Sequence, residues 1–267
     1  MWQAISRRGF LAVSAAALSW GQTRSPVCTL APEQEEGPYY IDERAVRRDI
    51  TEGKPGVPLA LRVVVLDAQS CRPLGNAAID IWHCDAVGVY SGFTAMNPGG
   101  PPPGMGTGMF PPRDGPPMRP PPGRRHLDAT RYLRGVQVTD ELGRVEFASV
   151  YPGWYIGRTI HIHFKVHVDS GHVCHTGQLF FPEEITADIA RLEPYSTHLD
   201  VHRTLQTEDG VFNGQHGGDS IMKLERLAPR SNAGGFLATI TLAVDPEATP
   251  WPVHGFGPPP GRPDFTR

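Results

Sequence analysis

Two histidines, His161 and His163, alternate with apolar residues in the segment YPGWYIGRTIHIHFKV, which runs from Tyr151 to Val166. The segment has the β-branched and aromatic content of a buried strand, and in a strand side chains i and i+2 project from the same face. Both imidazoles are therefore expected on one face, with Ile162 and its apolar neighbours on the other. Two imidazoles side by side can bind one metal ion. The alternative is a pair of solvent-facing or hydrogen-bonded histidines, which the spacing alone does not exclude.

Two tyrosines in nearby turns add possible oxygen donors. Tyr155 follows a Pro-Gly pair just before the strand, and Tyr90 follows Gly88 near the end of DIWHCDAVGVYSG (Asp80–Gly92). An aromatic residue after a strand is also a common packing residue. Phenolates are hard anionic donors, and with two neutral imidazoles they suit ferric iron, whose charge lowers a phenol's pKa below its usual value of about 10. Zinc sites draw instead on Cys, His and carboxylates.

The rest of the chain supplies strands that could position these donors. The 267 residues include 30 Gly and 28 Pro, a content typical of many turns and long loops rather than of a helical bundle. Short alternating or β-branched runs bounded by turn residues predict an antiparallel β-sandwich with at most one short helix, Glu183 to Leu192. The predicted strands are Leu59–Leu66, Ala77–His83, Arg134–Thr139, Val145–Val150, Ile160–Val168, Cys174–Phe181 and Leu237–Val244.

Both ends and one internal tract differ in composition from this domain. SRRGFLAVSAAALSWG (Ser6–Gly21) carries an Arg pair before a short apolar run, the pattern of a secretory signal of twin-arginine type. The run is too short to cross a bilayer comfortably, which disfavours a membrane anchor. We predict a signal peptide and leader over 1–27, a domain over 28–250 with a Pro/Gly-rich insertion at 97–125, and a Pro/Gly-rich tail over 251–267. The protein would then be exported, periplasmic or secreted, with no membrane contact in its mature form.

Four cysteines are present, and an exported protein can oxidise them. Four cysteines allow three complete pairings, and the sequence does not choose among them. Cys28 and Cys71 lie in expected loops, which favours this pair for a bridge. Cys84 and Cys174 lie in strand-like segments and would be buried thiols.

Four stretches together resemble the intradiol ring-cleavage dioxygenases, which include the protocatechuate and catechol dioxygenases. They are EGPYY (Glu36–Tyr40), DIWHCDAVGVYSG, YPGWYIGRTIHIHF and TGQLFF (Thr176–Phe181), and the resemblance spans about residues 28–245. The resemblance implies a mixed-topology β-sandwich around one non-haem ferric ion (Fe3+). The Pro/Gly-rich insertion and the signal peptide depart from the family pattern.

The resemblance also implies a ligand set. Tyr90 matches the tyrosine that stays bound to the metal, and Tyr155 the one that leaves when substrate binds. His161 matches the equatorial histidine and His163 the axial one. Tyr151 is a rival to Tyr155, but the ligand of the family follows the Pro-Gly pair.

Two further positions match residues on the substrate side of the family's site. Arg158 matches the arginine beside the substrate ring, and its alternative role is a structural ion pair. Gln178 matches a polar residue near the oxygen-binding side. With Tyr155, which would accept a substrate proton, they form the predicted catalytic set.

The implied activity is cleavage of a catechol by dioxygen between its two hydroxylated carbons, giving a cis,cis-muconate-type diacid that contains both oxygen atoms. The alternatives are an exported β-sandwich binding module without catalysis, and a zinc-dependent hydrolase that uses His161 and His163. The net charge of −3 gives no indication of a nucleic-acid partner. Relatives form dimers or larger assemblies, so a homo-oligomer is expected. Which catechol is the substrate is not readable from the sequence.

Overall fold

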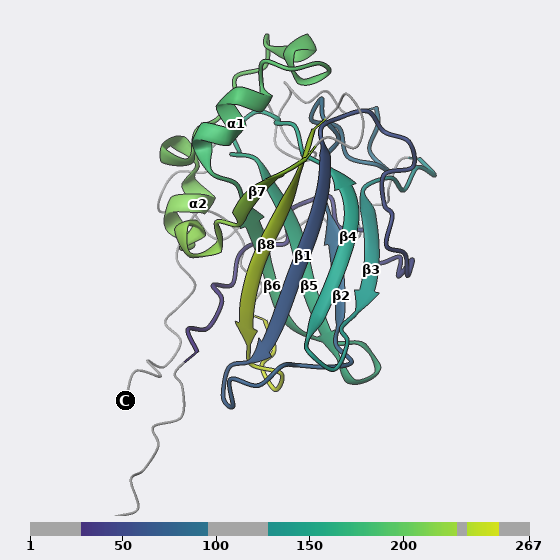
Figure 1. The fold of residues 1–267 in the computed structure, drawn as a ribbon, viewed down its shortest axis with the longest axis vertical. Helices are drawn as coiled ribbons and strands as arrows, with labels where there is room; N and C mark the ends of the chain where they lie inside the picture. Colours follow the sequence, from purple (N-terminus) through teal and green to yellow (C-terminus); the bar gives the residue numbers. More distant parts are fainter. Residues whose placement is uncertain (1–27, 96–127, 229–233, 251–267) are drawn as a thin grey trace, which may run out of the picture.

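The computed structural model describes residues 28–95, 128–228 and 234–250 (Figure 1). The predicted leader over 1–27, the insertion at 97–125 and the tail over 251–267 lie outside these residues. No helix in the described ranges is long and apolar enough to cross a membrane.

The described residues form two stacked four-stranded sheets (Figure 1). The first sheet has the order β4-β1-β8-β7, with β4 at Arg144–Val150, β1 at Pro58–Asp67, β8 at Gly235–Val244 and β7 at Lys223–Leu227. The second has the order β3-β2-β5-β6, with β3 at Arg134–Val138, β2 at Ala78–Trp82, β5 at His161–Val168 and β6 at His172–Phe180. The predicted β-sandwich is confirmed, and each of the seven expected strands is present.

Two features of the sheets were not predicted from the residue patterns. β1 pairs with β8 in parallel, whereas its other neighbour β4 is antiparallel, so the topology is mixed, as the resemblance implied. β7 was not anticipated because its sequence, KLERL, alternates poorly and is mostly exposed. Charged side chains on such an edge strand hinder pairing with further strands.

The core lies between the inner faces of the two sheets. Along β1, Leu59, Leu61, Val63 and Val65 are 0–2% exposed, whereas the residues between them are more exposed. The second sheet contributes Ile162 and other residues at alternate positions of its strands. Because the inner positions of β5 are apolar, its histidines occupy the outer face, as the period of two requires.

Most of the short helical segments follow β6 in the chain, and α1 and α2 lie beside the β7 edge in Figure 1, whereas η1 joins β5 to β6. The predicted helix is α1, which covers Glu183–Ile189. A second helix, α2 at Gly210–Gly214, has only five residues and gives no readable periodicity in the sequence. The 3-10 segments are η1 (Asp169–Gly171), η2 (Tyr195–His198), η3 (Gln206–Glu208) and η4 (Gly217–Ser220).

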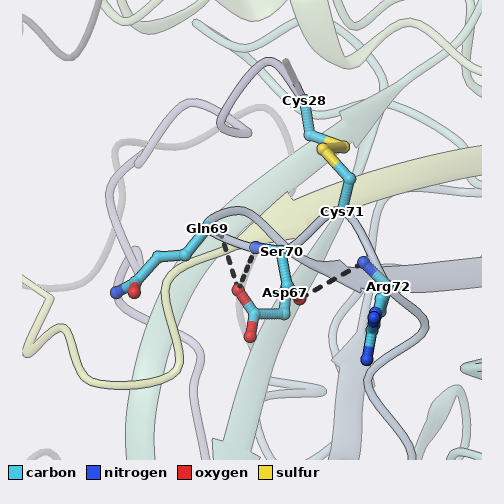
Figure 2. Close-up of a disulfide and its surroundings, with 6 residues drawn as sticks. All are labelled: Cys28, Asp67, Gln69, Ser70, Cys71 and Arg72. Atoms are coloured by element: carbon cyan, nitrogen blue, oxygen red, sulfur yellow. Dashed lines mark hydrogen bonds between the residues drawn. A yellow bond between two sulfur atoms is a disulfide. The ribbon is translucent and has the colours of Figure 1, made fainter. Parts of the chain in front are cut away.

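A disulfide joins Cys28 to Cys71, with 5.6 Å between the Cα atoms, and fastens the start of the described chain to the turn after β1 (Figure 2). Asp67 shapes this turn by accepting hydrogen bonds from the backbone N–H groups of Gln69 and Ser70. The expected bridge is therefore confirmed, and Cys84 and Cys174 are buried thiols.

Candidate metal centre

His161 and His163 project from the outer face of β5, and their rings meet. The two Nε2 atoms are 3.0 Å apart, and both side chains are at most 2% exposed. Strand register fixes this arrangement, because His163 lies directly between Trp82 of β2 and Gln178 of β6. Two buried ring nitrogens that face each other at this distance can share one cation.

Each imidazole is held by a different means. The Nδ1 atom of His161 lies 2.6 Å from the carbonyl oxygen of Thr159, a hydrogen bond that places the proton on Nδ1 and the lone pair on Nε2. The ring of His163 stacks on Trp82, with ring centres 5.0 Å apart and an angle of 3°. Gly37 also lies close to this ring, and an added Cβ atom there would stand 3.0 Å from Cε1 of His163.

Burial keeps both histidines neutral, the form that binds a metal ion. Burial, helped by the positive charge of Arg158, lowers the pKa of His161 to about 3. Burial and the neighbouring His161 hold the pKa of His163 well below its ordinary value.

The two predicted tyrosines converge on the histidines from separate turns. The hydroxyl of Tyr155 lies 3.2 Å from Nε2 of His161, and the rings of Tyr155 and Tyr90 are 5.7 Å apart between centres. The turns are packed together, because the N–H of Gly153 donates to the carbonyl oxygen of Asp85. A Cβ atom at Gly153 would lie 2.3 Å from the carbonyl oxygen of Ala86, so only glycine permits this approach.

The two tyrosine hydroxyls differ in their hydrogen bonding, since only that of Tyr155 has a partner of normal geometry, His161. The hydroxyl of Tyr90 is buried and makes no hydrogen bond of normal geometry. Burial raises the pKa of both Tyr90 and Tyr155 well above the ordinary value. A nearby metal ion reverses this effect by stabilising the phenolate form. The residues present therefore fit a hard, highly charged metal ion with two oxygen and two nitrogen donors.

No cluster of three or more His, Cys, Asp or Glu side chains that could hold a metal ion occurs in the described part of the chain. A zinc site of the usual composition is therefore not formed by these residues. His83 does not join the set, because its ring nitrogens contact the Cys84 carbonyl and the Ser149 hydroxyl. The hydroxyl of Tyr151 lies 2.7 Å from that of Thr186 in the core, so Tyr155 is the tyrosine beside the histidines.

An aromatic cluster surrounds the tyrosine side of the site. Tyr39 stacks on Tyr90 with ring centres 4.2 Å apart, and Phe93 and Tyr155 present ring edges to Tyr39. Trp82 and a buried thiol complete the cluster. A cluster of aromatic side chains of this kind excludes water and favours the binding of planar apolar molecules.

Arg158 lies beside the histidines in a buried polar network. Its Nε atom donates to both carboxylate oxygens of Asp209 at 3.0 and 3.2 Å, and Nη1 donates to Glu35 at 3.2 Å. Its Nη2 atom donates to the side-chain oxygen of Gln178 at 2.5 Å. Burial alone would lower the pKa of Arg158, but Asp209, Tyr155 and Glu35 raise it above the ordinary value. The structure therefore brings the predicted Arg158 and Gln178 into direct contact.

Sequence reasoning missed Asp209 and Glu35. Asp209 is fully buried at the N-cap of α2, where it accepts from the N–H groups of Val211 and Phe212 and from that of Thr159. An Asp before Gly-Val-Phe is an N-cap signal, but it gives no indication of the arginine partner. Glu35 stands directly before the EGPYY stretch and carries no local signal.

No protein-family model matches the chain, and no curated protein matches it either. Solved structures do match, and intradiol ring-cleavage dioxygenases are among them. One such enzyme from Tetranychus urticae is 32% identical, with a TM-score of 0.68, and the match covers 83% of this chain and 97% of that one. The chain therefore belongs to the intradiol ring-cleavage dioxygenase family.

More distant structures share the fold. The dioxygenase domain of a carbohydrate-binding fusion protein from Streptomyces sp. SirexAA-E is 24% identical, with a TM-score of 0.51, over 81% of this chain and 99% of that one. A 3-chlorocatechol 1,2-dioxygenase from Rhodococcus opacus 1CP is 18% identical, with a TM-score of 0.51, over 80% and 72% of the two chains. At these identities the likeness concerns the fold alone.

Proposed function

We propose that this chain binds one ferric ion through Tyr90, Tyr155, His161 and His163 and cleaves a catechol between its two hydroxylated carbons. The product would be a cis,cis-muconate-type diacid that contains both atoms of dioxygen. The observation that carries the proposal is the meeting of two imidazole nitrogens and a phenol oxygen within 3.0–3.2 Å, beside a second buried phenol. Membership of the family supports the same reaction.

Ferric iron, when bound, would supply Lewis acidity and draw electron density from the catecholate, which makes a ring carbon reactive toward dioxygen. The residues of the chain would handle the protons. Tyr155 lies in the turn that precedes β5. As a phenolate, its Oη atom could accept a proton from a catechol hydroxyl. Tyr90 is held by its stack on Tyr39 and would remain a phenolate donor throughout.

The aromatic cluster and Arg158 would act on the substrate ring. The rings of Tyr39 and Phe93 favour a planar molecule and exclude water from the reacting carbons. Arg158 remains cationic because its pKa is raised above the ordinary value, and it would stabilise negative charge that develops on the substrate ring. Gln178 fixes one side of the guanidinium through its oxygen.

Oxygen uptake by the iron-loaded protein across a panel of catechols, with the ring position of cleavage determined, tests the proposal. We expect one dioxygen consumed per ring and a diacid product. The protein should be coloured by phenolate-to-iron charge transfer, and Tyr90→Phe should lose the colour and most of the iron. A colourless protein that holds zinc would support the hydrolase, and an iron-replete protein that consumes no dioxygen would support the binding module.

We also propose that the protein works in an oxidising compartment after export. The disulfide between Cys28 and Cys71 supports this, since such bridges persist outside the reducing cytosol. Fractionation of cells with and without the Arg7 and Arg8 pair replaced by lysines tests the route. The expected homo-oligomer stays a prediction that the sedimentation coefficient would test.

A further inference from the structure

The loop that precedes β1 contains a lysine whose contacts lead to the tyrosine side of the candidate metal site. The Nζ atom of Lys54 lies 2.6 Å from the Oδ2 atom of Asp85 and 4.1 Å from the centre of the Tyr132 ring. The side chain of Asp85 is only 4% exposed, and that of Lys54 is 28% exposed. An ion pair with one partner so deeply buried is screened by solvent much less than a pair on the open surface.

Asp85 builds the turn that presents Tyr90. Its Oδ1 atom accepts hydrogen bonds from the backbone N–H groups of Val87 and Val89, at 3.1 and 3.0 Å. The backbone N–H of Asp85 also donates to the carbonyl oxygen of Val89, the residue directly before Tyr90. The carboxylate that binds Lys54 with one oxygen therefore closes, with its other oxygen, the turn that carries the Tyr90 ring.

Tyr132 leads to the other side of the same tyrosine. Its carbonyl oxygen accepts a hydrogen bond of 2.7 Å from the hydroxyl of Ser91, which directly follows Tyr90. The guanidinium of Arg134 donates to the hydroxyl and to the carbonyl oxygen of Ser91, both at 2.8 Å. Both chain neighbours of Tyr90 are therefore held, and Lys54 contacts one residue on each side.

The same loop also holds the turn that carries Tyr155. The backbone N–H of Tyr151 donates to the carbonyl oxygen of Val57 in this loop. Two residues further along, the N–H of Gly153 donates to the carbonyl oxygen of Asp85. The loop before β1 and the two tyrosine-bearing turns therefore form one hydrogen-bonded assembly.

The position of the Tyr90 oxygen depends on this assembly. Its hydroxyl is buried and makes no hydrogen bond of normal geometry. The oxygen is therefore placed by the packing of the ring, which stacks on Tyr39, and by the backbone that carries it. Contacts that orient a metal ligand from outside typically change metal affinity by about 10–100-fold when they are removed.

We propose that Lys54 is a positioning residue for the metal-binding tyrosines, and that it acts through Asp85 and Tyr132 rather than by contact with metal or substrate. The inference rests on the proposed function and adds to it a residue of a loop outside the site. Without the ammonium group the buried Asp85 carboxylate would lose its cationic partner, and the turn that it closes would rearrange. The oxygens of Tyr90 and Tyr155 would then no longer converge with the two imidazoles.

The test compares Lys54→Met, which removes the charge and keeps a long side chain, with Lys54→Arg, which keeps the charge. Lys54→Met should lower the affinity for ferric iron by at least about tenfold in competition with a chelator, and should shift the phenolate-to-iron absorption maximum. Lys54→Arg should restore most of both properties. In the iron-free protein, amide hydrogen exchange at Val89 and Gly153 should become at least about tenfold faster in Lys54→Met, with exchange along β5 unchanged.

Two controls separate positioning from a general loss of stability. Lys223→Met breaks an ion pair with Glu225 on exposed β7 and should leave iron affinity, absorption and exchange unchanged. Val63→Ala removes a buried side chain from the middle of β1, where Val63 pairs with β4 and β8, and should lower Tm. It should retain the iron affinity and the absorption maximum of the wild type.

A double variant, Lys54→Met with Asp85→Asn, removes both charges and also carries the test if Lys54→Met alone does not fold. The Asn side-chain oxygen can still accept from Val87 and Val89, so Tm should recover while iron binding stays weak. Recovery of both overturns the inference, because the pair would then only balance charge.

Wild-type iron affinity and amide exchange in Lys54→Met would also overturn the inference, and so would an equal loss of affinity in Val63→Ala at the same Tm. In each of these cases the proposed function stands, because the wild type still binds iron and cleaves catechol. A wild type that binds no ferric iron overturns the proposed function and this inference together.

Discussion

Replacing Gly37 by alanine should damage the candidate metal site through a single contact. Gly37 has a φ of +71°, and an added Cβ would stand 3.0 Å from Cε1 and 3.4 Å from Nε2 of His163. Carbon atoms in good contact are about 3.5–4.0 Å apart, so the ring must move by several tenths of an ångström. The movement of that ring is restricted, because one of its faces is stacked on Trp82.

The same substitution also strains the backbone, and the two effects must be separated. A non-glycine residue in the left-handed region costs about 1 kcal/mol. Gly53 offers a matched control, because its φ is +74° and no atom lies within 4 Å of its added Cβ. Gly37→Ala and Gly53→Ala should therefore each lower Tm by about 2–4 °C, because a loss of about 1 kcal/mol shifts Tm by that amount in a domain of this size.

Only Gly37→Ala should affect iron. Its iron content after dialysis against a fixed chelator concentration, and its visible charge-transfer absorption, should fall by about tenfold relative to wild type, which corresponds to about 1.4 kcal/mol of lost binding. Gly53→Ala should retain both. If Gly37→Ala binds iron as tightly as Gly53→Ala and has the same absorption maximum, the close packing of this glycine on the ligand ring has no role.

Three further perturbations have expected outcomes. Asp209→Asn removes one partner of a buried ion pair and should lower the free energy of unfolding by about 3 kcal/mol, measured by urea titration. Burial raises the pKa of Asp80 from 3.8 to about 7, so the native state binds more protons than the unfolded chain between these values, and stability should fall as pH rises from about 4 to about 7. Asp80→Asn should flatten that slope in Tm against pH, and an unchanged slope would contradict the assignment. Cys28→Ser with Cys71→Ser opens a loop with a sequence separation of 43 and should cost about 4 kcal/mol, which urea titration with and without reductant would measure.

Strands were predictable in this chain wherever burial on one face imposed an alternating pattern. β1 and β5 are examples, since each has apolar residues at every second position facing the core. β7 escaped prediction because an exposed edge strand has no such pattern, and α2 because five residues make little more than one helical turn. The parallel pairing of β1 with β8 depends on contacts between distant segments, which no local pattern encodes.

The two candidate histidine ligands were predictable for a local reason, Tyr90 and Tyr155 were assigned through the family resemblance, and the charge network was not predictable. His161 and His163 are two residues apart, so strand geometry alone places them together. Arg158 meets Asp209 across 51 positions of the chain and Glu35 across 123. Nothing in the spacing of such residues indicates a contact, and only the folded arrangement brings the two carboxylates to one guanidinium.

The two sides of the site are built from different kinds of structure, and this has a consequence for specificity. The histidines lie on a central strand whose register is fixed by ladders to β2 and β6. The segment that carries Glu35, Gly37 and Tyr39 has no strand pairing of that length. A hydrogen bond from the Gln178 backbone N–H to the Gln34 side-chain oxygen, together with the disulfide further upstream, helps to hold it. Substitutions in this segment are therefore expected to change which molecules the site accepts while β5 keeps its geometry, and Gly37 is the exception because an added Cβ there would touch the ring of the candidate ligand His163.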